Sequence, residues 1–145
     1  MIGIVVMMHG HIAQALVESA TGVLRGYDGK IVALGVQHGD EPAVIEQQLK
    51  AAIQSVTADG GVLILTDMFG GTPSNLGMTM HRAGSIEILT GASLPMVIKA
   101  MQLGRHPQTP DLTAVARDVK SAGERAMTIA TDILGMGKSN QASGR

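Results

Sequence analysis

The chain alternates between short apolar runs and longer stretches that have a helical period. The apolar runs are rich in β-branched residues and are bounded by glycine or polar residues, which is typical of buried strands. They predict strands over residues 2–7, 30–36, 61–66 and 85–89. Between these runs, apolar residues recur at spacings of three and four, the pattern of a helix that buries one face.

These periodic stretches predict helices over residues 12–24, 43–56, 73–83, from about 95 onward, and over about 110–134. The first helix is expected to bury a face made of Ile12, Ala15, Leu16, Ala20, Val23 and Leu24. Asp40 is a capping acid for the second helix, and Pro42 occupies its first turn, where the missing N–H costs nothing. Thr72 and Pro73 have the same relationship to the third helix, as cap and first residue.

Strands that alternate with helices of this length form βαβ units, and hence a mostly parallel sheet covered on both faces. The predicted fold is α/β, a three-layer α/β/α sandwich whose doubly wound sheet has a 2-1-3-4-like strand order. No internal repeat and no linker interrupts residues 1–137, so we expect a single domain there. Residues 138–145 are small and polar, and we expect a disordered tail.

Composition limits the range of functions. Tyr27 and Phe69 are the only aromatic residues beside ten methionines, so the core must consist of aliphatic side chains and thioethers. The formal net charge is −1, without a basic stripe or aromatic stacking platforms, which argues against a nucleic-acid partner. The chain has no cysteine, and therefore no disulfide, thiolate metal site or thiol nucleophile.

Targeting signals are not apparent. The first residues contain no basic leader, and no apolar run approaches the roughly 20 residues that a membrane span needs. We therefore expect a cytoplasmic protein that does not insert into a membrane.

Two loops are the best candidates for chemistry. In doubly wound sheets, ligands bind beyond the carboxyl ends of the strands, at the point between the first and third strands where neighbouring crossovers leave to opposite faces. That rule brings together His9 after the first predicted strand and Asp67 after the third. A neutral imidazole is a nucleophile, and a carboxylate at its second nitrogen fixes the tautomer and stabilises the developing positive charge.

Groups for binding an anion are close to both residues. Gly10 lets the backbone pass near a phosphoryl group, and the turn at Gly70, Gly71 and Thr72 offers N–H donors and a hydroxyl. Simpler interpretations stay open, because a histidine after a strand is often solvated, glycine pairs form turns, and Thr72 or Asp67 can cap local structure.

The other histidines are weaker candidates. His11 is expected in the first turn of a helix, facing water, and His38 lies outside the favoured crevice beside the turn and cap residues Gly39 and Asp40. A metal site from His9, His11 and Asp67 is an alternative without a specific spacing signature, so we expect neither a metal nor a cofactor. The phosphate loop GxxxxGK[ST], the dinucleotide motif GxGxxG and the elbow GxSxG are absent.

Two separated motifs carry a family resemblance. The opening IGIVVMMHGHIAQALVESATGVLRG and the stretch GVLILTDMFGGTPSN resemble the IIA component of the mannose-type phosphoenolpyruvate-dependent sugar phosphotransferase system (PTS), and the likeness extends through ILTGASLPMVIKAM over roughly residues 1–135. The resemblance implies a phosphocarrier, a phosphotransferase in which His9 receives a phosphoryl group from phosphohistidine on HPr and passes it to a histidine of a IIB protein or domain. It also implies that Asp67 orients His9, that Thr72 helps to hold the phosphoryl group, and that the chain forms a homodimer.

The chain departs from the family pattern in two respects. Many sugar-transporting members have tryptophan just before the two glycines, where this chain has Phe69, and many carry a fused IIB domain. The chain therefore resembles a stand-alone IIA protein. Two alternatives remain: a regulatory relay, in which the phosphorylation state of His9 controls binding to a target protein without sugar transport, and a flavodoxin-like binder of a small ligand in the same crevice.

Overall fold

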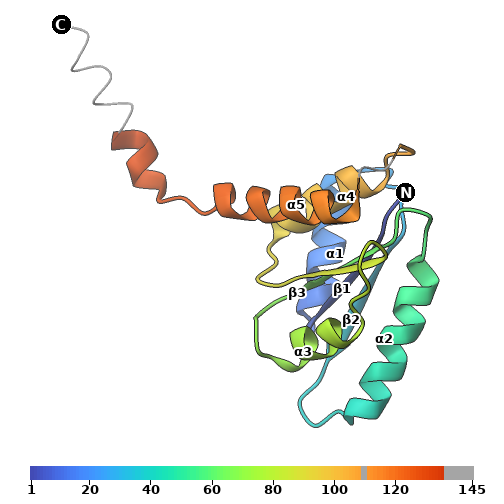
Figure 1. The fold of residues 1–145 in the computed structure, drawn as a ribbon. Coiled ribbons are helices and arrows are strands. Elements are labelled where there is room, and N and C mark those ends of the chain that lie inside the picture. The colour runs from blue at the N-terminus through green and yellow to red at the C-terminus, as the bar shows by residue number, and fades with distance from the viewer. Residues whose placement is uncertain (109–110, 136–145) are drawn as a thin grey trace, which may run out of the picture.

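The computed structural model describes residues 1–108 and 111–135, in which four strands form one parallel sheet between two layers of helices (Figure 1). The strands are β1 (Gly3–His9), β2 (Ile31–Val36), β3 (Val62–Thr66) and β4 (Ile86–Leu89), paired in the order β2-β1-β3-β4. Every pairing in this sheet is parallel. The predicted α/β sandwich and its 2-1-3-4 strand order are thus confirmed.

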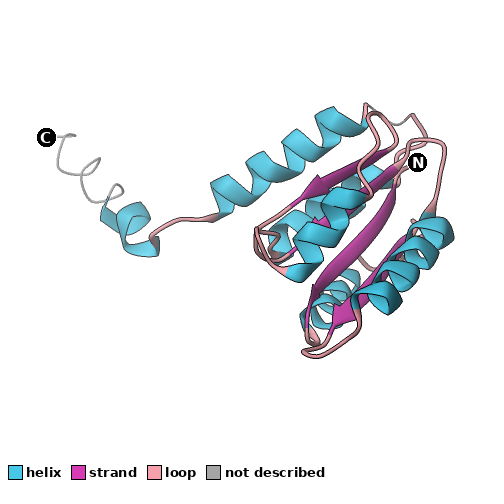
Figure 2. Ribbon diagram, turned by 60° about the horizontal axis from the view of Figure 1, so that its bottom comes forward, coloured by secondary structure: helices cyan, strands magenta, loops and turns pink. Residues whose placement is uncertain are grey.

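The helices are α1 (Ile12–Val23), α2 (Pro42–Val56), α3 (Thr72–Thr79), α4 (Leu94–Gly104) and α5 (Leu112–Ala126). α2, α3 and α4 each have proline in the first turn, where its fixed φ suits a helix start. At the start of α5, the Asp111 carboxylate accepts a hydrogen bond from the Ala114 N–H at 3.2 Å. α1, α4 and α5 cover one face of the sheet, while α2 and α3 cover the other (Figure 2).

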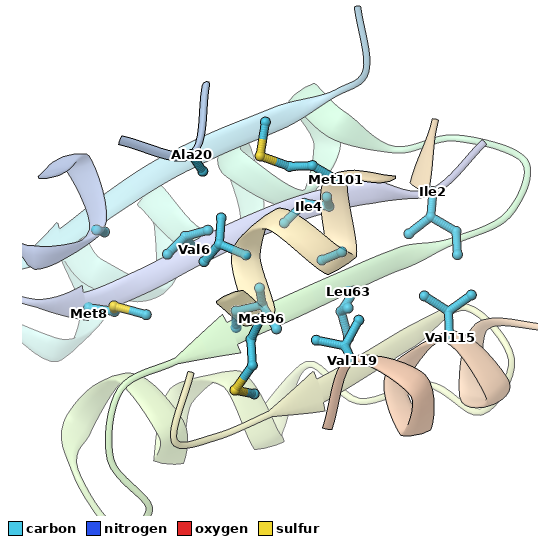
Figure 3. Packing of buried hydrophobic residues seen from close by; sticks show 14 of the residues in the cluster. Ile2, Ile4, Val6, Met8, Ala20, Leu63, Met96, Met101, Val115 and Val119 are labelled. Carbon is cyan, nitrogen blue, oxygen red and sulfur yellow. The ribbon is translucent and has the colours of Figure 1, made fainter. Parts of the chain in front are cut away.

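The core lies on both faces of the central strands, because successive side chains of a strand point to opposite faces. Ile4, Val6 and Met8 of β1 pack toward α1, α4 and α5, as Figure 3 shows, whereas Val5 and Met7 pack toward α2 and α3. This explains why the strands read as continuous apolar runs rather than alternating ones. Methionines contribute to the core as expected, and Met8, Met96 and Met101 are buried between the sheet and the layer of α1, α4 and α5.

The buried face of α1 differs from the predicted one. Ile12, Ala15 and Val23 are exposed, and α1 contacts the sheet through Ala13, Ala20 and the half-buried Leu16, Val17 and Leu24. The two faces overlap in part, and small alanines let the helix approach the sheet closely. Ile12 and Val23 lie at the two ends of α1, where they are 48% and 61% exposed.

The predicted caps of α2 and α3 are wrong. Glu41 and Gly71 are the N-cap residues, and neither makes a side-chain cap hydrogen bond. The Asp40 carboxylate instead accepts a hydrogen bond from the Gln37 N–H at 2.8 Å, which closes a turn before the helix. Thr72 is the first residue of α3, which ends at Thr79 rather than near residue 83.

The last periodic stretch is not one helix. α5 ends at Ala126, Met127 has extended backbone angles, and residues 130–135 are helical again. Figures 1 and 2 show this second piece projecting away from the sheet. Residues 136–145, which include the predicted tail, lie outside the described residues. Within the described ranges, no helix is both long and apolar enough to cross a membrane.

Candidate functional site

His9 and Asp67 meet at the carboxyl ends of the two central strands. His9 is the last residue of β1 rather than part of the following loop, and Asp67 follows β3 directly. The Nδ1 atom of His9 lies 2.8 Å from Oδ2 of Asp67, and the backbone N–H of His9 donates to the same oxygen at 2.9 Å. The juxtaposition that the crevice rule predicts is therefore present in the structure.

The Asp67 carboxylate carries the negative charge of this pair. Burial would raise its pKa, but hydrogen bonds from the backbone and ring of His9 and from the Met68 N–H outweigh that effect and lower the pKa below its ordinary value. Asp67 is therefore ionised at neutral pH. Its side chain is 18% exposed while that of His9 is 43% exposed, so the charge lies behind the ring and the ring reaches solvent.

The turn after β1 separates the two nearby histidines. Gly10 has φ 57°, in the left-handed region that glycine adopts without strain. The turn leads to His11, which is the N-cap residue of α1 and is exposed, as predicted. Among residues 1–108 and 111–135, no group of three histidine, cysteine, aspartate or glutamate side chains is arranged to hold a metal ion, so His9, His11 and Asp67 do not form the alternative metal site.

The turn between β3 and α3 lies against the His9 ring. A Cβ atom added to Gly71 would be 2.8 Å from Cε1 and 3.4 Å from Nε2 of His9, so only glycine fits beside the unmodified ring. Ser74, which the sequence analysis did not single out, is buried, and its hydroxyl accepts from the Gly70 N–H at 2.9 Å and donates to the Gly71 carbonyl at 3.1 Å. The Gly70 N–H is thus engaged, and Gly70 contributes its left-handed turn.

An open cavity of about 400 Å³ lies beside His9. Thr72 lines it together with His9 and Gly10, and Gln37 and His38 line it from the loop between β2 and α2. The prediction that His38 lies outside the crevice is therefore wrong. The available signal was the strand order, since β2 pairs with β1 up to His9 and Val36, so the loops that follow these strands start side by side.

Comparisons with known proteins agree with this architecture. A model of the family described as "PTS system fructose IIA component" matches residues 3–119, so the chain belongs to that family. A PTS system fructose-specific EIIA component of Bacillus subtilis (strain 168) is 24% identical over 135 residues, covering 92% of this chain and 90% of that protein. A PTS system mannose-specific EIIAB component of Escherichia coli (strain K12) is 25% identical over 128 residues, but this chain spans only 39% of its length.

Solved structures with the same fold carry related names. An EIIA phosphotransferase system component from Streptococcus agalactiae has a TM-score of 0.77 at 19% identity, covering 91% of this chain and 99% of that one. A mannose/sorbose-specific IIA subunit from Enterococcus faecalis has a TM-score of 0.74 at 21% identity, covering 88% and 92% of the two chains. These structures show that the fold is shared, while the family match over residues 3–119 makes the chain a member of the IIA components, which are phosphotransferase relay proteins.

Proposed function

We propose that this protein is a phosphocarrier of a sugar phosphotransferase system, in which His9 receives a phosphoryl group from a phosphohistidine on an HPr-like donor and passes it to a histidine of a IIB protein or domain. The observation that carries the proposal is the pairing of His9 Nδ1 with an ionised Asp67 while the rest of the ring borders an open cavity. Family membership supports the same role.

Asp67 selects the tautomer that this reaction needs. An ionised carboxylate can only accept hydrogen bonds, so the short contact with Nδ1 requires a proton on that nitrogen. Nε2 of His9 then keeps its lone pair and is the nucleophile. When Nε2 binds phosphorus, positive charge develops on the ring, and the nearby negative charge of Asp67 stabilises it.

The transfer is a displacement at phosphorus between two imidazoles. The lone pair of His9 Nε2 forms the new N–P bond, the N–P bond to the donor histidine breaks, and its electron pair returns to the donor ring. In the second transfer, the IIB histidine attacks the phosphorus atom, the N–P bond to His9 breaks, and its electron pair returns to the His9 ring. The protein contributes positioning and electrostatic stabilisation, and the proposed bond changes involve only the two imidazoles and the phosphoryl group.

The start of α3 is the proposed cradle for the phosphoryl oxygens. A Cβ atom added to Gly71 would lie 3.4 Å from Nε2, and Thr72 lines the same cavity. The N–H groups of Gly71 and Thr72 and the Thr72 hydroxyl are therefore the proposed donors to the group that Nε2 would carry. The positive end of the helix dipole adds to this attraction. Gly10 also lines the cavity, and a Cβ atom added to it would meet nothing within 4 Å, which leaves room for the phosphoryl group.

Exposed apolar side chains close to His9 in the sequence or next to Asp67 are consistent with a phosphoryl donor and a phosphoryl acceptor that are both proteins. Met68 and Phe69 directly follow Asp67 and are 58% and 72% exposed, and Ile12 at the start of α1 is 48% exposed. Phenylalanine and methionine are enriched at the centres of protein interfaces. We propose that both partner proteins dock on this apolar rim, defined as Ile12, Met68 and Phe69.

A second copy of this chain is the proposed partner of the projecting C-terminal segment. Met127, Ile129, Ile133 and Leu134 are exposed by 78%, 66%, 59% and 67%. The segment leaves the body of the protein (Figure 1), so the sheet and its helices cannot cover these side chains. Groups of exposed apolar side chains mark interaction sites, and in a homodimer the segment of each copy would be buried against the other copy.

One reconstitution tests the central proposal. The protein incubated with phosphoenolpyruvate, enzyme I and HPr is expected to acquire an acid-labile, base-stable phosphoryl group, the signature of phosphohistidine. His9→Ala is expected to abolish the labelling with little change in the thermal unfolding curve, because the ring lies at the surface. His11→Ala is the matched control and is expected to retain most of the labelling. Label that persists on His9→Ala would overturn the proposal.

A further inference from the structure

A second histidine, His38, also lines the cavity at His9. The lining residues come from the end of β1 and the turn after it, from the loop between β2 and α2, and from the first residue of α3, with Val36 and Ile45 as the apolar part. Residue 38 lies outside the sequence motifs that carry the family resemblance, and the mechanism proposed for His9 does not use it. The position of His38 therefore needs its own explanation.

The loop that carries His38 is fixed relative to His9. The Gln37 N–H donates to the Asp40 carboxylate at 2.8 Å, and the Asp40 N–H donates to the Gln37 carbonyl at 3.2 Å. The Gln37 side-chain amide also donates to the Gly10 carbonyl at 3.2 Å, which ties this loop to the turn directly after His9. His38 is thus held at the cavity wall by its neighbours on both sides, while its own imidazole is exposed.

The negative charges in and beside the cavity disfavour a phosphoryl group unless a positive charge compensates for them. A phosphoryl group brings between one and two negative charges at neutral pH, next to the ionised Asp67 behind His9. Among the described residues that line the cavity, none is lysine or arginine, and Asp40 adds another carboxylate. Apart from His9 itself, His38 is the lining side chain that can carry a positive charge.

We propose that His38, in its protonated form, is a second phosphoryl-binding residue that stabilises the phosphoryl group on His9 across the cavity. This inference rests on the proposed function of His9. A charge-assisted hydrogen bond from an imidazolium to a phosphoryl oxygen favours the phosphorylated over the unphosphorylated protein. Loss of the positive charge at position 38 is expected to lower the equilibrium constant for phosphoryl transfer onto His9 by about three- to tenfold.

The test compares His38→Gln, which keeps a hydrogen-bond donor without the charge, with His38→Lys, which keeps the charge. Radiolabelled phospho-HPr is mixed with each variant, and the ratio of the two phosphoproteins is measured at equilibrium. An equilibrium constant does not depend on how fast HPr docks, so a docking role for His38 would leave it unchanged. His106→Gln removes an imidazole just beyond α4, away from the cavity, and is the matched control for loss of a histidine.

The pH dependence separates a charge effect from a structural one. Of the described residues, His9 and Asp40 are the other titratable groups that line the cavity, and Asp67 pairs with His9, while Ile45 of α2 and Thr72 of α3 carry no charge. Those groups are common to all variants, so the ratio of each variant to the wild type isolates position 38. A histidine side chain carries a positive charge only when it is protonated, so any charge at position 38 decreases as the pH rises. The defect of His38→Gln is expected to be larger at pH 6 than at pH 8, and His38→Lys is expected to match or exceed the wild type at both.

The outcomes distinguish this inference from the proposed function. A wild-type protein that takes no label from phospho-HPr would overturn the proposed function and the role of His38 together. A labelled wild type whose equilibrium constant at pH 6 equals that of His38→Gln would overturn the role of His38 alone. A defect shared by His38→Gln and His38→Lys at both pH values would also overturn it, because the charge would then not be responsible.

Discussion

A single carboxylate oxygen, Oδ2 of Asp67, holds both the ring and the backbone of His9. It lies 2.8 Å from Nδ1 and accepts the His9 backbone N–H at 2.9 Å. The other oxygen of Asp67 accepts the Met68 N–H at 2.9 Å. The His9 ring therefore cannot rotate without losing a hydrogen bond to a group that is itself fixed at the end of β3.

Asp67→Asn should reduce phosphoryl transfer far more than it reduces stability. The amide keeps the size of the side chain but removes the negative charge, and its NH₂ group can donate to Nδ1 and favour the tautomer that has its proton on Nε2. We expect a transfer rate about 10- to 100-fold lower and a similar thermal midpoint. A time course of transfer from phospho-HPr, beside thermal unfolding curves, measures both. Equal rates with an intact fold would reduce Asp67 to a turn residue.

The same pair predicts how stability responds to acid. The pKa of Asp67 is lowered in the folded protein, so its stabilising contribution is complete above the ordinary carboxyl pKa of about 3.9 and is lost as the pH falls through the lowered value. The amide side chain of the Asp67→Asn variant does not titrate. The stability advantage of the wild type over this variant, about 1 kcal/mol or less for a partly exposed pair, should therefore shrink between about pH 5 and pH 2. Urea unfolding at both pH values measures it, and an advantage that grows in acid would contradict the prediction.

Gly71→Ala tests the close approach of α3 to the nucleophile. The backbone angles of Gly71, φ −79° and ψ 167°, suit alanine, so the backbone is not strained. The new Cβ would lie 2.8 Å from Cε1 of His9, and the ring must move. Small displacements of reacting atoms cost about 10²-fold in rate, and we expect a loss of that order with little change in stability. Gly22→Ala on α1, where no atom lies within 4 Å, is the control. Normal transfer by Gly71→Ala would show that the ring position is not critical.

The parts of the fold that depend on local pattern could be predicted from the sequence. Continuous apolar runs between helical stretches define a parallel sheet, and the crevice rule then brings His9 and Asp67 together. The end of α5 could not be predicted, because Ile129 and Ile133 continue the helical period although their side chains are exposed. Periodicity reports which residues are apolar, but not whether anything packs against them.

The site residues that the sequence did not indicate act through tertiary contacts. Ser74 fixes the Gly70-Gly71 turn through a buried hydroxyl, a geometry that no spacing rule specifies. Gln37 reaches Gly10 from a neighbouring loop 27 positions away in the chain. His38 was misjudged because the crevice rule names the gap between the first and third strands, whereas the cavity also extends toward β2.

Phe69→Ala tests the apolar rim as a docking surface. The side chain is 72% exposed, so its loss should cost little stability. Truncation of an aromatic anchor at an interface typically costs at least tenfold in affinity, and we expect KM for phospho-HPr to rise by about that factor. Labelling by phosphoramidate, a small chemical donor that needs no docking, should be unchanged. Met78→Ala on α3, with a side chain 45% exposed outside the rim, is the control. An unchanged KM would place docking elsewhere.

The projecting segment predicts the oligomeric state and the residues that maintain it. If a second copy covers Ile133 and Leu134, light scattering at micromolar concentration should give about twice the chain mass of 15.0 kDa. The double variant Ile133→Asp and Leu134→Asp would bury two charges from each copy at that interface, a cost that a small contact cannot offset, so we expect the monomer mass.

The controls separate loss of the dimer from loss of the fold. Ile133 and Leu134 follow the end of α5 and lie outside the sheet sandwich, so the monomeric double variant should keep its thermal unfolding transition and its phosphoryl acceptance at His9. Val44→Asp on α2 introduces a charge at a side chain that is 46% exposed on the folded body, and it should leave the dimer intact. A wild-type mass near 15.0 kDa would contradict the homodimer, and a double variant that remains dimeric would mean that a different surface joins the two copies.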